Sequence, residues 1–177
     1  MNKILLLITM LLVSNSVLSQ NDTRIHLKIG VNNIDLNNDG IADTLFMATY
    51  DNNTSHPSET LTVFVKTGEN WFIVPVPDDD GFTLADFRLS GSALKVNGVE
   101  LHRFKGIAYL IRAVKYAADG DITDGSKVTF SRYKLAENND DPGTSVFYWE
   151  AAGSYLTEQI FNSVDDAFQT LAMEKFR

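Results

Sequence analysis

The stretch Asp35-Leu36-Asn37-Asn38-Asp39-Gly40-Ile41-Ala42-Asp43 is the most regularly patterned part of the chain. Oxygen-bearing side chains alternate at its start, and Gly40 follows where a sharp turn needs a residue without a Cβ. Residues 23–30 before it and 44–50 after it are strand-like, and residues 23–29 alternate polar and apolar side chains, as half-buried strands do. The pattern therefore predicts two strands joined by an acidic loop.

Two interpretations of this loop remain open from the sequence. Calcium takes six to eight oxygen ligands, and the loop offers them from the set Asp35, Asn37, Asp39, the Ile41 backbone and Asp43. The twelfth position, a bidentate Glu in an EF-hand, is Phe46, so the loop is not an EF-hand. The other interpretation is a hairpin loop in which Asp and Asn side chains accept hydrogen bonds from backbone amides as Asx-turns.

The rest of the chain predicts more strands and one terminal helix. Strand patterns continue through residues 59–66, 71–76, 86–89, 93–104, 107–117, 128–135, 145–150 and 155–161, and Asn97-Gly98 has the composition of a hairpin turn. Near the end the period changes: Ser163 is a good N-cap, and an apolar stripe follows at Val164, Ala167, Phe168, Leu171 and Ala172. The predicted class is mainly β (α+β), a single domain of antiparallel sheet with one C-terminal amphipathic helix.

The first residues have the pattern of a signal peptide. Lys3 is followed by an apolar run over residues 4–13, which is too short to span a bilayer. Cleavage is expected after Ser19, and a second option is after Ser16. Residues 20–177 then form the single mainly-β domain, which we expect in the periplasm. The lack of cysteine agrees with a bacterial exported protein that is not disulfide-stapled.

The charge of the chain excludes some partners. The 15 basic and 23 acidic residues give a net charge of −8, and loss of Lys3 with the leader makes it −9. Because phosphate contacts need Lys and Arg, an acidic surface without a basic stripe argues against nucleic acid.

No residue pattern supports catalysis. The histidines His26, His56 and His102 are far apart and lack the spacing of a zinc site. His26 and His102 fall in strand patterns, where surface or edge positions are expected, whereas His56 lies in a polar loop that favours a functional role. Fragments of the Ser-x-x-Lys and Lys-Thr-Gly kind occur at strand or turn positions in the wrong order, so no β-lactamase site is predicted.

Five motifs, taken in order, resemble a known family of proteins. They are Asp35-Leu-x-x-Asp39-Gly40-x-x-Asp43, Asp51-Asn52-x-x-Ser55-His56, Trp71-x-Ile-Val-Pro75, Asp86-Phe-Arg-Leu89 and Val128-Thr-Phe-x-x-Tyr133-x-Leu135. Together they resemble the carbapenem self-resistance proteins of the CarF/CarG (CpmJ) type. The two types are similar in these motifs, with a slight preference here for CarF.

The resemblance implies an exported protein that gives its bacterium self-resistance to a carbapenem without hydrolysing it, and hence not an enzyme. Protection would come from binding the drug or from protecting its cell-wall target. The expected partners are the carbapenem or a penicillin-binding protein, with a homodimer as a further option and no membrane span.

The carboxylate of a carbapenem calls for a cation and hydrogen-bond donors. Of the residues in the matched motifs, Arg88 and His56 are the candidates for ligand binding, and the alternative for Arg88 is an ion pair with Asp86 or another acid. The alternatives for the whole protein are a calcium-stabilised structural or interaction domain and a hydrolase of unrecognised type.

Overall fold

The computed structural model describes residues 22–51, 53, 55–89, 94–115 and 121–177. Its elements are β1 (Thr23–Ile25), β2 (Gly30–Ile34), β3 (Asp43–Tyr50), β4 (Ser58–Thr67), β5 (Asn70–Ile73), β6 (Thr83–Ala85), β7 (Phe87–Arg88), β8 (Lys95–Phe104), β9 (Ile107–Lys115), β10 (Val128–Glu137), β11 (Phe147–Leu156), the helix α1 (Val164–Phe168) and a 3-10 turn at Met173–Lys175. The predicted leader lies outside the described residues. No helix in the described part of the chain is long and apolar enough to cross a membrane.

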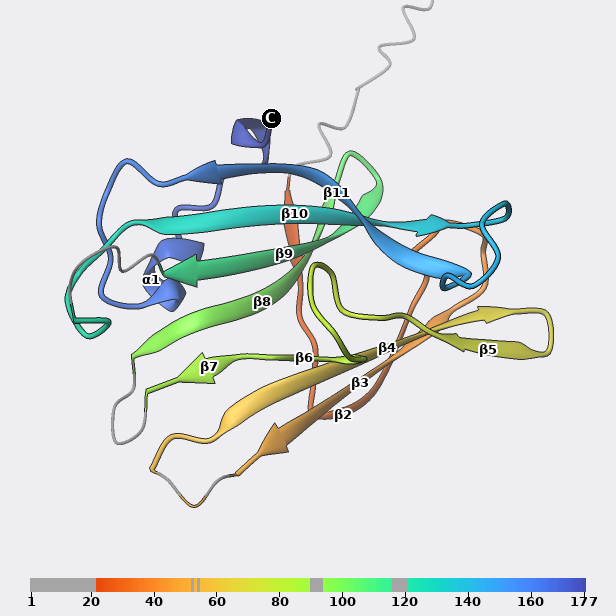
Figure 1. Ribbon diagram of the computed structural model, residues 1–177, viewed down its shortest axis with the longest axis horizontal. Coiled ribbons are helices and arrows are strands. Elements are labelled where there is room, and N and C mark those ends of the chain that lie inside the picture. The colour runs from red at the N-terminus through yellow and green to blue at the C-terminus, as the bar shows by residue number, and fades with distance from the viewer. Residues whose placement is uncertain (1–21, 52, 54, 90–93, 116–120) are drawn as a thin grey trace, which may run out of the picture.

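The strands form two antiparallel sheets that pack face to face (Figure 1). The first sheet has the order β1-β8-β9-β10-β11, with β7 also paired to β8. The second sheet has the order β2-β3-β4-β5, with β6 also paired to β4. The predicted mainly-β class with a C-terminal helix is therefore confirmed.

Alternating side chains of both sheets fill the space between them. Leu61, Val63 and Val65 of β4 are buried there, as the period of two in the sequence predicts. Leu101 of β8 and Leu110 of β9 face them from neighbouring positions of the first sheet. The core between the sheets thus follows directly from the strand periodicity.

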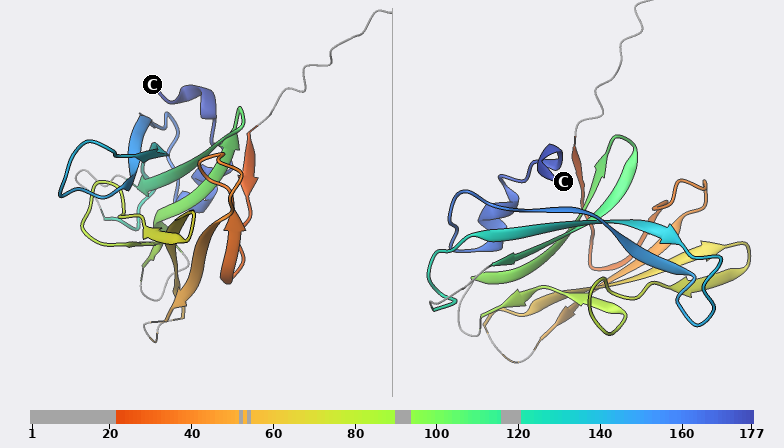
Figure 2. Two further views of the ribbon diagram at one scale, coloured as in Figure 1. Left: turned by 90° about the vertical axis from the view of Figure 1, so that its right-hand side faces the viewer. Right: turned by 45° about the horizontal axis from the view of Figure 1, so that its top comes forward.

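The first sheet is buried on its other face as well. Ile111, Phe130, Val164 and Phe168 belong to a second apolar cluster, which joins this face to the C-terminal segment. Figure 2 shows the resulting three layers: the second sheet, the first sheet, and the segment that contains α1. Because β9 has cover on both sides, its sequence is apolar almost throughout rather than strictly alternating.

The predicted hairpin at Asn97-Gly98 is wrong, because β8 runs straight through these residues. The turn that joins β8 to β9 is Lys105-Gly106, where both residues have positive φ (50° and 83°), as a type I′ turn requires. A Cβ on Gly98 would lie 3.0 Å from the Val164 side chain and 3.1 Å from the Phe168 ring. Gly98 therefore permits close packing of α1 on the sheet rather than a turn.

The C-terminal helix begins where the sequence predicts but is short. The Ser163 hydroxyl accepts a hydrogen bond from the Asp165 backbone N–H at 3.3 Å, which confirms the N-cap. Val164, Ala167 and Phe168 of the predicted stripe are buried. The helix nevertheless ends at Phe168, so the rest of the stripe packs without helical structure.

Candidate functional site

The loop between β2 and β3 shows the hydrogen bonds of the turn interpretation. Asp35 accepts the backbone N–H of Asn38 at 2.7 Å on Oδ1 and that of Gly40 at 3.0 Å on Oδ2. Asp39 Oδ1 accepts the Ile41 backbone N–H at 2.7 Å. These side chains close the loop on its own backbone, as Asx-turns do.

The Asn37 side chain makes two hydrogen bonds with Asp39, one as acceptor and one as donor. Its Oδ1 accepts the Asp39 backbone N–H at 3.2 Å, and its Nδ2 donates to Asp39 Oδ2 at 3.0 Å. The outer side of the loop thus has its oxygens engaged within the loop itself.

Asp43, unlike the exposed side chains of the loop, lies in the interior of the protein. Its carboxylate is completely buried and accepts the Leu36 N–H at 2.9 Å and the Lys66 N–H at 3.1 Å. Burial raises the pKa of the Asp43 carboxyl above its ordinary value, against the lowering effect of these two bonds. Asp43 therefore ties the loop to the end of β4.

A guanidinium also lies against the loop. Arg103 donates to the Asp35 carbonyl at 2.9 Å and to Asn38 Oδ1 at 3.1 Å. A fixed positive charge there repels a bound cation. Within the described residues no three His, Cys, Asp or Glu side chains gather as metal ligands. Calcium binding by Asp35, Asn37, Asp39, Ile41 and Asp43 stays a prediction beside the turn chemistry that the structure shows.

Calcium removal tests that prediction. A bound ion at about 100 times its dissociation constant stabilises the native state by about 2.7 kcal/mol. If the loop binds calcium, the melting temperature should therefore rise with calcium and fall when EDTA removes it. A melting temperature that is the same in calcium and in EDTA would contradict calcium binding and favour the Asx-turn interpretation of the loop.

The two residues predicted to bind a ligand lie in different parts of the fold. His56 is half-buried in the loop between β3 and β4 of the second sheet. Arg88 ends β7 at the edge of the first sheet, and its guanidinium pairs with Asp165 of α1 at 3.5 Å. The ion pair predicted as the alternative for Arg88 is present, with Asp165 as the acid.

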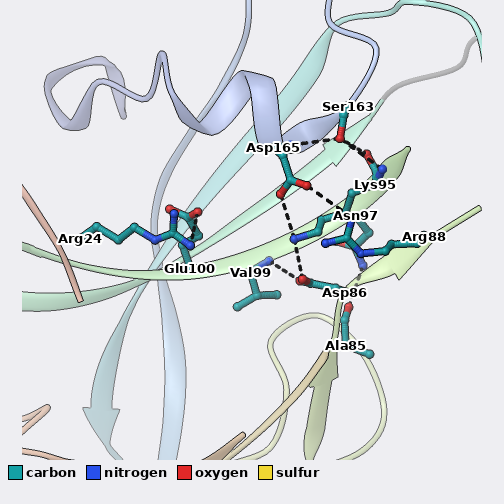
Figure 3. Close-up of polar contacts among 10 residues, drawn as sticks. All are labelled: Arg24, Ala85, Asp86, Arg88, Lys95, Asn97, Val99, Glu100, Ser163 and Asp165. Carbon is teal, nitrogen blue, oxygen red and sulfur yellow. Dashed lines mark hydrogen bonds and ion pairs between the residues drawn. The ribbon is translucent and has the colours of Figure 1, made fainter. Parts of the chain in front are cut away.

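Arg88 belongs to a cluster of charges that surrounds Lys95 (Figure 3). The buried Lys95 Nζ lies 2.7 Å from Asp86 Oδ2 and 2.9 Å from Asp165 Oδ1. Burial alone would lower the pKa of Lys95, but the two carboxylates outweigh it and raise this pKa above its ordinary value. Lys95 is therefore a charged group that holds α1 against the start of β8.

Asp86 lies where the chain crosses from one sheet to the other. It separates β6, which pairs with β4 of the second sheet, from β7, which pairs with β8 of the first. Its backbone N–H donates to the Glu59 carbonyl at 2.9 Å, and its Oδ1 accepts the Val99 N–H at 3.0 Å. Asp86 thus fixes this crossing to both sheets.

A cavity of about 440 Å³ opens beside this crossing. One wall is formed by the first sheet through Asn97, Val99, Arg112 and Val114. The other wall consists of Val76 and Pro77, the turn at Asp79 and Asp80, β6, Asp86 and Phe87. Small-molecule sites in proteins have volumes of roughly 300–1,000 Å³ and mostly apolar linings, so the cavity is the candidate functional site.

Arg112 provides a cation on the first-sheet wall. It pairs with Val99 across β8 and β9, and both face the second sheet. In the described part of the chain, no carboxylate lies within 4.0 Å of its guanidinium and no hydrogen bond engages it. Lys115 follows Arg112 by three positions on β9, so its side chain points to the opposite face of the sheet. There its Nζ donates to the carbonyls of Ile122 and Asn162 at 2.9 and 2.8 Å.

No motif in the sequence indicates Arg112 or the cavity. Arg112 interrupts the apolar run of β9, and such an interruption is the one available hint. The surface or edge position predicted for His102 is wrong, because β8 lies between β1 and β9 and His102 is buried, with Nδ1 at 2.9 Å from Asp22 and Nε2 at 2.9 Å from Glu100.

Comparisons with known proteins give consistent matches. A family model described as carbapenem resistance protein CarG-like matches residues 27–170. A solved structure, the crystal structure of CarG, is similar with 34% sequence identity and a TM-score of 0.81, covering 88% of this chain and 99% of that one. A search of curated proteins finds no match. Both matches carry the CarG name, so neither supports the slight preference for the CarF type.

Proposed function

Since this chain belongs to the CarG-like family of carbapenem resistance proteins, we propose that it protects a bacterium by binding an intact carbapenem rather than hydrolysing it. The observation that supports binding is the cavity of about 440 Å³ between the sheets, which is large enough for a small bicyclic molecule. Family membership therefore supports the role in carbapenem resistance, and the cavity supports drug binding as its mechanism.

The lining of the cavity supports protection without hydrolysis. Among the described residues that line it there is no serine, cysteine or histidine. The one hydroxyl there, that of Thr83, is hydrogen-bonded to the Thr62 hydroxyl at 2.9 Å. A serine-type hydrolase needs a nucleophile within hydrogen-bond reach of a base, and this wall offers none.

Purified residues 20–177 mixed with a carbapenem test the binding mechanism. We expect the absorbance of the β-lactam to persist and the melting temperature of the protein to rise, because a ligand that binds only the native state stabilises it. A heat-denatured sample is the control for spontaneous decay of the drug. Loss of absorbance only with native protein would make the protein a hydrolase of unrecognised type.

Export is the second part of the proposal, and the pattern of residues 1–19 supports it. Cells that make the whole chain are expected to tolerate a carbapenem, and the mature protein should begin at Gln20. Cells that make residues 20–177 after a start codon should lose this tolerance, since the drug acts outside the cytoplasm. Equal tolerance in both strains would contradict a periplasmic role.

One observation favours protection of the target as the alternative mechanism. The outer face of the second sheet exposes Val31 (49%), Phe46 (46%), Trp71 (51%) and Ile73 (38%). Val31 and Phe46 are direct cross-strand partners, and contiguous exposed apolar patches often mark protein interaction sites. An intact drug without a thermal shift would make this face, with a penicillin-binding protein or a second copy as partner, the leading mechanism.

A further inference from the structure

We infer that Arg112 binds the carboxylate of a small ligand in the cavity, and that the apolar groups at its rim cover the rest of the molecule. The inference rests on the proposed binding function and adds the residue and the ligand class. No earlier motif pointed to Arg112, and the sequence-based candidate cation was Arg88 instead.

The environment of Arg112 favours the binding of an anion. The side chain is half-buried on the wall that faces the second sheet. A half-buried arginine loses hydrogen bonds to water, and in proteins these are normally replaced by bonds to a carboxylate or to several other acceptors. Since the described residues supply Arg112 with neither a hydrogen bond nor an ion pair, its planar fork of N–H donors is available to a ligand carboxylate.

The other charged groups around the cavity are already engaged or lie in solvent. Asp86 is neutralised by Lys95 at 2.7 Å. The Asp78 carboxylate accepts the Tyr133 hydroxyl. Asp79 and Asp80 lie on the exposed turn across the cavity, where water and salt screen their charge. The balance at the first-sheet wall is therefore positive, although the whole chain is acidic.

The rim of the cavity fits the apolar part of such a ligand. Phe87, Val114 and Ile122 line the cavity and are 54%, 38% and 38% exposed. Large apolar side chains left exposed around a hollow gain stability when a ligand removes them from water. A cation inside and apolar groups outside favour a compact carboxylate such as a bicyclic β-lactam acid over a sugar or a nucleotide.

Affinity measurements on matched variants test the inference. The probes are meropenem and its methyl ester, titrated calorimetrically into the mature protein. Wild type should prefer the acid to the ester by about 10-fold or more, because a charge-assisted bidentate bond is lost with the ester. Arg112→Gln should lose about 10- to 100-fold in affinity for the acid and no longer separate acid from ester. Arg112→Lys keeps the positive charge but lacks the planar pair of N–H donors, so its affinity for the acid should lie between those of wild type and Arg112→Gln.

The control variants are Arg88→Gln and Lys134→Gln. Arg88→Gln removes a cation whose carboxylate partner is Asp165, and Lys134→Gln removes a cation that pairs with Glu150 and does not line the cavity. Both should keep the preference for the acid. The inference is overturned if Arg112→Gln, with an unchanged melting temperature, binds meropenem as wild type does, or if Arg88→Gln alone loses the preference.

Carbapenem tolerance of cells that make the same variants separates the inference from the proposed function. Loss of binding and of tolerance in Arg112→Gln supports both. Loss of binding with full tolerance supports the role of Arg112 and overturns drug binding as the mechanism of protection. Wild-type protein that does not bind meropenem overturns both.

Discussion

Replacement of Lys95 by methionine is expected to lower the melting temperature by about 10 °C. The substitution leaves Asp86, whose side chain is 7% exposed, without its partner at 2.7 Å, and it removes the contact of Asp165 with β8. Removing one member of a buried ion pair costs about 3–5 kcal/mol, and about 2–4 °C is lost per kcal/mol in a chain of this size. Thermal denaturation followed by circular dichroism measures the shift.

Lys134→Met is the matched control for this prediction. Lys134 pairs with Glu150 at 2.6 Å, a distance as short as that in the Lys95 pair, but both side chains are nearly half exposed (46% and 45%). Exposed ion pairs contribute little, because water already solvates both charges. Lys134→Met should therefore leave the melting temperature unchanged. Equal effects of the two substitutions would show that the cluster around Lys95 does not hold α1 in place.

His102→Gln is expected to destabilise the protein by about 3 kcal/mol at pH 6 and by much less at alkaline pH. Both ring nitrogens face carboxylates at 2.9 Å, those of Asp22 and Glu100, so the ring needs two N–H donors and a positive charge. Arg24 of β1 pairs with Glu100 at 3.0 Å, and Tyr109 is the cross-strand neighbour of His102 on β9. The cluster therefore attaches β1 to β8.

The direction of the pH dependence follows from the pKa of His102. Burial alone would lower this pKa, but the hydrogen bonds and charges of Glu100 and Asp22 outweigh burial and raise it above the ordinary value of 6.5. A group whose pKa is raised in the folded state stabilises that state below its unfolded pKa. This contribution is lost as the pH rises through the raised pKa.

Urea denaturation from pH 5.5 to 9 measures this loss. Wild type should become less stable as the pH rises above 6.5, whereas His102→Gln should lack that part of the pH dependence. His26→Gln is the control, since His26 is exposed. A wild-type profile that matches that of His102→Gln would rule out an imidazolium between Asp22 and Glu100.

The amino-acid sequence determined the features that depend on local spacing. The alternation of Leu61, Val63 and Val65 predicted which face of β4 is buried, because side chains of a strand point to opposite faces in turn. Ser163 predicted the start of α1, since a hydroxyl there satisfies a free backbone N–H. The turn chemistry of residues 35–43 was one of the two interpretations that the loop sequence allowed.

Sequence spacing misled where a residue served a neighbour distant in the chain. Asn97-Gly98 has the composition of a hairpin turn, but Gly98 is needed where Val164 and Phe168 approach the strand. The true turn, Lys105-Gly106, lacks the usual Asn or Asp at its first position. Local composition could not separate a glycine required by φ from one required by packing.

Only the tertiary structure decided which polar groups lie together. The partner of Lys95 on α1 lies about 70 residues away in the sequence, and Asp22 reaches His102 over 80 residues because β1 pairs with β8. Arg112 is an ordinary strand residue until the second sheet covers its face and forms the opposite wall of a cavity. Periodicity fixes which way a side chain points, but the register and packing of distant strands decide which charges meet.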